Sequence, residues 1–333
     1  MKKLNELELL FYDFEVYTGA NWWCVCLINY NTKEKYCITD IETFKNFYEE
    51  HKEYIWVGYN SRGYDQFLVK GLLLGQSVFD INREIIEEDK RGHQVVRNGN
   101  KIKLYNFDVM KDKGLKQVEG FMGSMIKETD VPFDIQRTLT DFEIKQIIDY
   151  CYHDVGETIK VFEKTIEEFN THLSLIEAFN LPFDNFNKTQ AQLISDILGA
   201  VRIDNREDSF DFTIVDTLRL GAKYKCVMDW YLNPLNHWYK KGKTETNQLS
   251  IDVAGVKNDF GYGGLHGARP NYSDEGIFIN SDVASYYPSM MIEYDFSSRN
   301  IRDKLKFRDI RDTRFAYKKA KNPLQLPYKI VLS

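Results

Sequence analysis

The sequence predicts an α/β fold in which one mixed sheet is combined with several helices. Three observations lead to this prediction. The first half of the chain alternates runs of aromatic and β-branched residues with stretches of helical periodicity. The length of 333 residues suits two domains. A composition that is 43% hydrophobic and 14% aromatic supplies a packed core, which excludes a mainly disordered chain.

The elements of the first half follow one another as three strands, a helix, a strand and further elements of both kinds. Strands are predicted where aromatic and β-branched residues dominate, at residues 7–16, 22–30, 35–39, 54–59 and 101–109. Helices are predicted where apolar residues recur at helical spacing, at residues 41–51, 64–74 and 139–169. Asp40 stands in the N-cap position of the first helix, and Thr140 with Glu143 forms a capping box at the start of the last. The turn Thr18-Gly19-Ala20-Asn21 joins the first two strands as a hairpin, so one mixed sheet is expected.

The second half of the chain is less regular. A domain boundary is expected near Asn180, followed by a helix at 189–201 and a poorly patterned region to about Gly255. Residues 261–268 form a glycine-dense loop, and the apolar residues 276–280 predict a strand that leads into a turn.

The net charge of −6 hides an asymmetry between the two ends of the chain. Residues 1–239 carry 28 basic and 39 acidic residues, whereas residues 240–333 carry 16 and 11. The overall charge disfavours a generic nucleic-acid binder. The basic C-terminal stretch is either a solvated face or a surface that binds anions.

Cysteine usage and the N-terminal residues indicate the compartment. The five cysteines are odd in number, and none forms a Cys-x-x-Cys pair: Cys24, Cys26, Cys37, Cys151 and Cys226. Neither a zinc site nor a disulfide framework is therefore predicted, and reduced, mostly buried thiols are expected. No run approaches 18 uninterrupted apolar residues, and the start lacks an apolar signal core, so we expect a cytoplasmic protein without a membrane segment.

Asp13 and Glu15 stand two residues apart in the first predicted strand, so both side chains project to the same face. Two carboxylates in this position repel one another unless a cation lies between them. Oxygen ligands of this kind suit Mg²⁺ or Mn²⁺. The alternative is an exposed polar strand face.

Two further acidic motifs follow along the chain. Asn60-Ser-Arg-Gly-Tyr64-Asp65 is placed where a strand ends and a helix begins, which is where ligands collect in α/β sheets. Its alternative is a simple turn, with Asp65 in the first turn of the helix. Tyr150 and Asp154 stand at i and i+4 on the long helix, where a phenol and a carboxylate on one face can hold a water beside a metal. Their alternative is a core tyrosine with an ordinary surface aspartate.

Taken in order, these motifs resemble the DEDD-type 3′–5′ exonuclease domain of DNA polymerases, in its tyrosine variant, over about residues 1–180. The resemblance implies an RNase H-like fold and a centre of two Mg²⁺ or Mn²⁺ ions held by Asp13, Glu15, Asp65 and Asp154. It also implies that Tyr150 orients the attacking water, and that Asn60 contacts a single-stranded 3′ end. Two ions suit this chemistry because they stabilise both the attacking and the leaving oxygen of a phosphodiester.

Asp282-Val-Ala-Ser-Tyr-Tyr-Pro-Ser289 is the most specific pattern in the sequence, and it resembles motif A of family B DNA polymerases of phage type. The resemblance implies that Asp282 binds the catalytic Mg²⁺ ions. It implies that Ser285 and Tyr286 contact the incoming deoxynucleoside triphosphate. Tyr287 would exclude a 2′-hydroxyl, because a ring packed against the sugar leaves no room for another oxygen. A plain strand-turn-helix explains only the proline, as the start of a helix.

Neighbouring segments resemble other elements of the same family. Tyr262-Gly263-Gly264 is a compressed form of a Tyr-x-Gly-Gly element that binds template DNA, where adjacent glycines allow close approach of the backbone. Arg314 and Lys318, one helical turn apart, resemble a pair in the fingers that binds triphosphate. Lys329 resembles the lysine that opens motif B, although Ser333 stands where the family usually has asparagine.

The second pair of palm carboxylates, in motif C, and the thumb of this family are not found in the sequence. We therefore expect an N-terminal portion of a family B DNA polymerase. Its exonuclease domain would span 1–180, a connector and the start of the palm 181–260, and an incomplete α+β palm with a short helical fingers segment 261–333. The expected partners are primer-template DNA, a single-stranded 3′ end and deoxynucleoside triphosphates, and these residues alone are not expected to polymerise.

Two alternatives remain open. One is a stand-alone DEDD-type exonuclease whose C-terminal region binds DNA or nucleotide without catalysis. Such a protein would degrade DNA but would not polymerise it. The other is a non-enzymatic module that holds primer-template DNA through its basic C-terminal stretch. That module requires salt-sensitive binding that does not depend on any of the acidic motifs.

Overall fold

The computed structural model describes residues 7–110, 112–201, 214, 217–236, 247–262, 264–298 and 300–333. The chain divides into two compact units, Met1–Val201 together with Tyr287–Ser333, and Arg202–Tyr286. We call these the first and the second unit and describe each by itself. Among the described residues, none of the helices has both the length and the apolar character that a membrane crossing requires.

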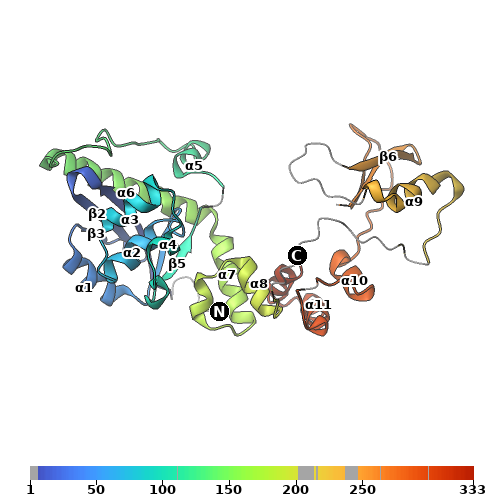
Figure 1. Ribbon diagram of the computed structural model, residues 1–333. Coiled ribbons are helices and arrows are strands. Elements are labelled where there is room, and N and C mark those ends of the chain that lie inside the picture. The colour runs from blue at the N-terminus through green and yellow to red at the C-terminus, as the bar shows by residue number, and fades with distance from the viewer. Residues whose placement is uncertain are drawn as a thin grey trace. The chain divides into compact units, whose positions relative to one another are not determined.

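The first unit is built on a mixed sheet of five strands in the order β3-β2-β1-β4-β5 (Figure 1). The strands are β1 (Leu9–Tyr17), β2 (Trp22–Asn29), β3 (Lys35–Ile38), β4 (Ile55–Gly58) and β5 (Tyr105–Asp108). β1 pairs antiparallel with β2, and β2 with β3, whereas β1, β4 and β5 run parallel. The predicted α/β class with one mixed sheet is therefore confirmed.

Helices of the first unit pack on both faces of this sheet and extend beyond it. The helices before residue 201 are α1 (Ile41–His51), α2 (Asp65–Leu73), α3 (Val78–Asn82), α4 (Gly92–Val95), α5 (Leu115–Met122), α6 (Asp141–Lys164), α7 (Ile166–Ala178) and α8 (Gln190–Ile197). A single π-helical turn, η3 (Arg83–Glu87), follows α3. Asp40 caps α1 by accepting the N–H of Thr43 at 2.9 Å, and Thr140 forms the capping box of α6 with Glu143, both as predicted.

Three predicted elements of this unit are shorter than expected. The stretch 139–169 is two helices rather than one, because the helix ends at Thr165, whose hydroxyl turns back to the carbonyl of Val161 at 2.9 Å. The strand expected over 101–109 is limited to β5, since a 3₁₀ turn occupies Gly99–Lys101. The helix expected over 189–201 ends at Ile197, shortly before Gly199, which has a φ of 61°.

The central strand β1 is buried on both faces because alternate residues belong to two different cores. Phe11 and Tyr17 lie in the core that contains the buried residues of α6. Tyr12 lies in the opposite core, with the buried residues of α1, α2 and α3. Asp13 and Glu15 fall in the same row as Phe11 and Tyr17, so acidic groups interrupt an apolar surface under α6.

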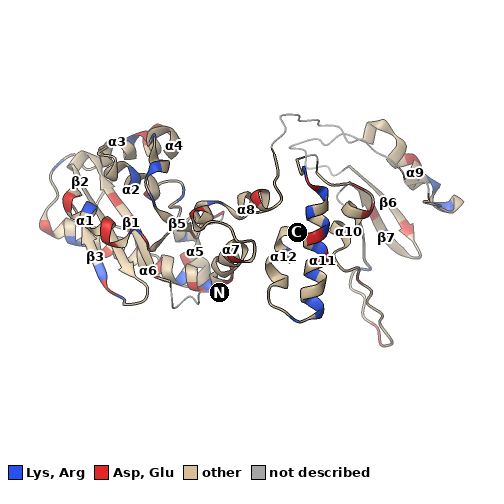
Figure 2. Cartoon of the chain, turned by 90° about the horizontal axis from the view of Figure 1, so that it is seen from below, with Lys and Arg blue, Asp and Glu red and all other residues tan. Residues whose placement is uncertain are grey.

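The C-terminal residues of the first unit add three helices. They are α10 (Tyr286–Glu293), which begins at the last residue of the second unit, α11 (Lys304–Lys319) and α12 (Gln325–Val331). α12 packs on α7 and on α11, and Phe307, Ile310 and Val331 join the core that contains α6. Basic side chains recur along α11 (Figure 2).

The second unit contains a three-stranded antiparallel sheet and a helix. Its elements are α9 (Lys225–Leu232), β6 (Gln248–Val253), β7 (Val256–Gly261) and β8 (Gly264–Gly267). Ala254 and Gly255, with φ of 52° and 76°, form the tight turn between β6 and β7. The region before Gly255, which was predicted to lack a pattern, thus contains α9 and β6. The expected glycine-dense loop at residues 261–268 contains β8.

The strand expected at residues 276–280 is not formed, so this prediction was wrong. Ile277 is 96% exposed and Ile279 is 89% exposed. A strand requires hydrogen-bonded neighbours, and none of the described strands pairs with this segment. Its apolar composition suits a strand, but composition alone supplies no partner.

Candidate active site

Asp13 and Glu15 lie on the face of β1 that α6 covers. The side chain of Glu15 is buried, with 6% of the residue exposed. Carboxylate oxygens of the two residues and the sulfur of Cys151 all lie within 4.8 Å of one another. The two acids therefore share one face of the strand and are close enough to hold a common ligand.

Asp65 reaches β1 from the first turn of α2. The chain turns at Asn60, which has a φ of 56° and is exposed, and Asp65 then lies only 3% exposed. Asp65 Oδ1 accepts a hydrogen bond at 3.2 Å from the N–H of Phe14, the residue between Asp13 and Glu15. The helix N-terminus also places partial positive charge beside this carboxylate.

Tyr150 and Asp154 complete the cluster from α6. Asp154 is 8% exposed, and its carboxylate interacts with the hydroxyl of Tyr150 and raises the pKa of that hydroxyl, after burial. Between them in sequence, Cys151 Sγ donates to the backbone oxygen of Asp13 at 3.4 Å. One helix face therefore brings the phenol and the fourth carboxylate to the acidic residues of β1.

Burial and mutual repulsion raise the pKa of every acid in this cluster. For Asp13, burial is the largest cause, followed by the charges of Asp65, Glu15 and Asp154. Burial is also the first cause for Glu15 and Asp154, and it raises the pKa of Asp65 to about 7. Buried like charges of this kind favour the binding of a cation. The pKa of Tyr150 is raised as well, by burial and by Asp154, so its hydroxyl keeps its proton.

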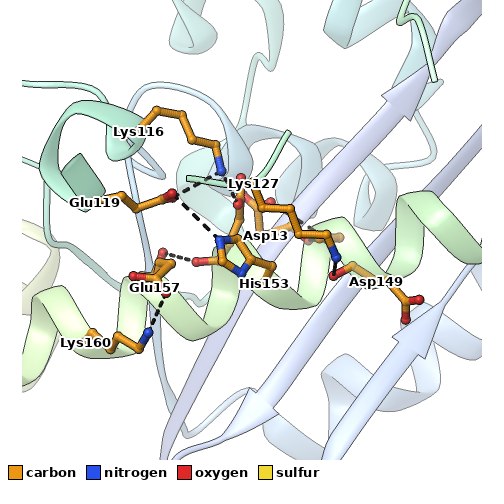
Figure 3. A network of polar contacts seen from close by, with 11 residues as sticks. Asp13, Lys116, Glu119, Lys127, Asp149, His153, Glu157 and Lys160 are labelled. Carbon is orange, nitrogen blue, oxygen red and sulfur yellow. Dashed lines mark hydrogen bonds and ion pairs between the residues drawn. The ribbon is translucent and has the colours of Figure 1, made fainter. Parts of the chain in front are cut away.

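A lysine that belongs to none of the sequence motifs partly balances this charge. Lys116 Nζ on α5 lies 2.5 Å from Asp154 Oδ1 and 3.1 Å from Glu119 Oε1. Glu119 is fully buried, and its other oxygen lies 3.7 Å from His153 Nε2 (Figure 3). These contacts link α5 to α6 beside the acidic cluster. Lys116 precedes Asp154 by 38 residues, so no local spacing signals the pair.

A further acid, Asp108, lies at the end of β5, next to the turn after β4. Its carboxylate accepts the N–H groups of Arg62 and Met110, each at 2.9 Å. Burial raises the pKa of Asp108, and its charge adds to the repulsion on Asp65. Asp108 therefore fixes the turn that carries Asn60. An acidic residue at the end of a predicted strand was the available sequence signal.

A cleft of about 750 Å³ opens beside Glu15. Its walls include the aromatic rings of Tyr64 and Phe133 and the side chain of Arg83. Phe133 is 55% exposed and stacks on Tyr17, with ring centroids 5.0 Å apart. Glu87 and Asp134 also line the cleft, and Arg83 pairs with Asp80 at 2.7 Å. The cleft therefore offers aromatic rings beside the buried acids.

The division of the chain into two units falls within the motif at residues 282–289. Asp282, Ser285 and Tyr286 belong to the second unit, and Tyr287 belongs to the first. Ser285 has a φ of 51°, so the chain turns sharply before α10 begins at Tyr286. Tyr286 is 50% exposed and Tyr287 66% exposed, and Asp282 is exposed as well.

The remaining sequence candidates are divided between the two units. Tyr262 follows β7, and its ring lies 5.8 Å from that of Trp230, between centroids. Gly263 lies outside the described residues, and Gly264 begins β8. Three basic candidates lie on helices of the first unit: half-buried Arg314 and exposed Lys318 on α11, and exposed Lys329 on α12.

Comparison with models of known protein families and with curated protein sequences gives no match to this chain. The geometry of the site and the sequence motifs therefore carry the functional conclusion.

Proposed function

We propose that the chain carries a DEDD-type 3′–5′ exonuclease of the tyrosine variant, as part of a family B DNA polymerase of phage type. The observation that carries this proposal is the convergence of four acids from three elements: Asp13, Glu15, Asp65 and Asp154. The strand order β3-β2-β1-β4-β5, with β1 antiparallel to β2 and parallel to β4, supports an RNase H-like fold for the exonuclease.

The four carboxylates fit a pair of divalent cations such as Mg²⁺ or Mn²⁺. All the donors are hard oxygens, which these ions prefer. Burial, followed by the charges of neighbouring acids, raises the pKa of each of these residues, and Lys116 alone does not offset this. Ions held by Asp13, Glu15, Asp65 and Asp154 would supply Lewis acidity that stabilises negative charge at the phosphate and acidifies a water.

Tyr150 positions the attacking water. Its raised pKa keeps the phenol protonated, and its hydroxyl interacts with Asp154. The hydroxyl oxygen can therefore still accept a hydrogen bond from a water beside that carboxylate. A neutral phenol is a poor base, so Tyr150 orients the nucleophile rather than deprotonating it.

The substrate of this centre is a single-stranded 3′ end of DNA. The cleft beside Glu15 presents the rings of Tyr64 and Phe133, on which unpaired bases stack irrespective of sequence. Arg83 in the same cleft pairs with Asp80 at 2.7 Å, so a phosphate that binds there would compete with that carboxylate. Asn60, exposed at the turn before α2, contacts the strand near the reacting end.

The polymerase part of the proposal rests on residues 282–289. In it, Asp282 binds Mg²⁺, and Ser285, Tyr286 and Tyr287 surround the deoxynucleotide. The sharp turn at Ser285 before α10 supports this, because a turn that opens a helix presents backbone N–H groups to phosphate.

Basic and glycine-rich segments would serve the same polymerase reaction. Arg314 and Lys318 stand one turn apart on α11, and with Lys329 they would bind the triphosphate. Tyr262, Gly263 and Gly264 would contact the template. This role is consistent with a location in the cytoplasm of a host cell, where DNA and deoxynucleotides are available.

A stand-alone exonuclease with a non-catalytic C-terminal region is the second candidate. The exposed, non-strand conformation of residues 276–280 favours it. A catalytic carboxylate such as Asp282 needs a rigid supporting element to hold its geometry. Without such support the segment would bind nucleotide or DNA but would not polymerise.

Two assays on the product of the complete reading frame separate these candidates. The first follows shortening of a labelled single-stranded oligodeoxynucleotide in Mg²⁺, and the second follows primer extension with deoxynucleotides. Both candidates predict shortening. Extension that is abolished by Asp282→Asn supports the polymerase, whereas shortening without any extension supports the stand-alone exonuclease. Extension that survives Asp282→Asn contradicts the assigned role of Asp282.

A further inference from the structure

Four of the five cysteines gather on the face of the sheet that α6 covers. Cys24 and Cys26 alternate along β2, so both side chains project to the same face. Cys37 on β3 is the direct partner of Cys26 across the antiparallel pair. Cys151 approaches the same spot from α6, and Cys24, Cys26 and Cys151 are each 0% exposed. Residues far apart in sequence thus bring four thiols together.

The spacing of the three buried sulfurs suits one metal ion. Those of Cys24, Cys26 and Cys151 all lie within 4.8 Å of one another. For three atoms with such separations, some point always lies within about 2.8 Å (4.8/√3) of all of them. A zinc–sulfur bond measures about 2.3 Å. An inward movement of at most about half an ångström per sulfur therefore completes three bonds, well within side-chain freedom.

The fourth thiol, Cys37, completes the set and opens it to solvent. It faces Cys26 across the antiparallel pair of β2 and β3, and the residue is exposed at the edge of the sheet. Lys35, two residues earlier on the same face of β3, places its ammonium 5.1 Å from the ring centre of Tyr152. An ion can therefore enter beside Cys37, and a positive charge lies nearby to offset a thiolate cluster.

We infer that Cys24, Cys26, Cys37 and Cys151 form a binding site for one thiophilic divalent ion of the Zn²⁺ type. Four sulfur donors favour a tetrahedral Zn²⁺ site over Mg²⁺ or Mn²⁺, which prefer oxygen. Each metal–sulfur bond forms as one thiol proton leaves to solvent, so no oxidant or reductant takes part. Its donors are sulfurs rather than carboxylates, although Cys151 Sγ also lies within 4.8 Å of carboxylate oxygens of Asp13 and Glu15. The inference does not rest on the exonuclease proposal.

Bound metal at this site would fix the helix that carries Tyr150 and Asp154 of the candidate active site. Cys151 lies between Tyr150 and Asp154 on α6, and its partners lie on β2 and β3. Its sulfur also contacts the backbone oxygen of Asp13 at 3.4 Å. A metal clamp across these three elements therefore holds α6 in register with β1. Its expected effect is higher thermal stability, because a ligand that binds only the folded state stabilises it.

Cobalt substitution tests this inference with a spectroscopic signal that oxygen ligands do not give. Reduced, metal-stripped full chain is titrated with Co²⁺ in the presence of saturating Mg²⁺, which occupies hard oxygen sites. The expected result is one Co²⁺ per chain, with an intense sulfur-to-cobalt charge-transfer band and tetrahedral d–d bands. Added Zn²⁺ then bleaches these bands, because zinc binds more tightly than cobalt at the same ligands.

Variants assign the signal to particular thiols. Cys37→Ser changes an exposed residue and is expected to fold, which circular dichroism checks. It should weaken Co²⁺ binding by more than about 10-fold, because loss of even an outer-shell partner lowers metal affinity by that factor. Cys151→Ser should do the same from α6. Cys226→Ser, at an exposed cysteine outside the cluster, is the matched control and should leave the bands unchanged. Absence of a charge-transfer band in the reduced chain, or Co²⁺ binding as tight in Cys37→Ser as in the wild type, would overturn the inference.

Discussion

The ammonium of Lys116 lies 2.5 Å from Asp154 Oδ1, so α5 brings a cation directly to one of the four clustered acids. The same ammonium lies 4.8 Å from the ring centre of Tyr150. Lys116 therefore touches both residues that α6 contributes to the candidate centre. In a cluster whose acids all have a raised pKa, this contact is the main local source of positive charge.

Lys116→Met should make Mg²⁺ a stronger stabiliser of the protein. Removing the ammonium leaves Asp154 without its ion pair, so the metal-free variant should melt at a lower temperature than the wild type. A divalent ion then meets no competition for that carboxylate, so the rise in melting temperature on adding Mg²⁺ should be larger. Thermal unfolding with and without Mg²⁺ measures both effects.

Lys160→Met is the control for this experiment, since Lys160 pairs with Glu157 at 2.6 Å on the same helix. It should leave the effect of Mg²⁺ on the melting temperature unchanged. An equal or smaller effect of Mg²⁺ in Lys116→Met than in the wild type would show that Lys116 does not compete with the metal.

Tyr150→Phe should slow 3′–5′ degradation by about 10²-fold, which is the usual size of a contribution from a group that positions a proton or a water. The change removes one hydroxyl and leaves the four carboxylates in place, so binding of Mn²⁺ should persist. Single-turnover degradation and Mn²⁺ binding measure the two quantities. Tyr152→Phe, two residues away on α6 and facing Lys35, should retain the wild-type rate. A Tyr150→Phe variant with full activity would remove the phenol from the mechanism.

Metal-free protein should lose stability as the pH rises from about 4 to about 7, and Asp65 should account for part of the loss. The pKa of this carboxyl is raised from 3.8 to about 7, so the folded state binds its proton more tightly than the unfolded state does. Its contribution to stability is therefore full below about pH 4 and is lost as the pH passes through the folded value. Asp65→Asn cannot titrate and should show a weaker decline in melting temperature across this range. Parallel declines in the two proteins would contradict the assigned pKa.

The central sheet and the four clustered acids follow from local sequence patterns. Asp13 and Glu15 could be placed on one face because a strand alternates its side chains, and Tyr150 and Asp154 because a helix repeats every 3.6 residues. Asp65 required only the position of a strand end. Such short-range rules predict which side chains share a surface, and the capped helices α1 and α6 follow from the same rules.

The parts that sequence did not reveal depend on contacts between distant segments. Lys116 meets Asp154 only because α5 packs on α6. The thiol cluster was missed because it depends on the register that places Cys37 opposite Cys26, which no spacing motif encodes. Residues 276–280 show the converse, since their composition predicts a strand but the strand needs a partner that composition does not provide.

Degradation of a 5′-labelled single-stranded oligodeoxynucleotide by Asp13→Asn, compared with the wild type, tests the central claim most directly. Asparagine keeps the shape of the side chain and removes one of the mutually repelling charges, so the metal-free variant should be folded and melt at a higher temperature than the wild type. The account predicts Mg²⁺-dependent stepwise shortening from the 3′ end by the wild type and none by this variant. Shortening by Asp13→Asn at the wild-type rate, or none by the wild type in Mg²⁺, would contradict a metal-dependent exonuclease centre at these four acids.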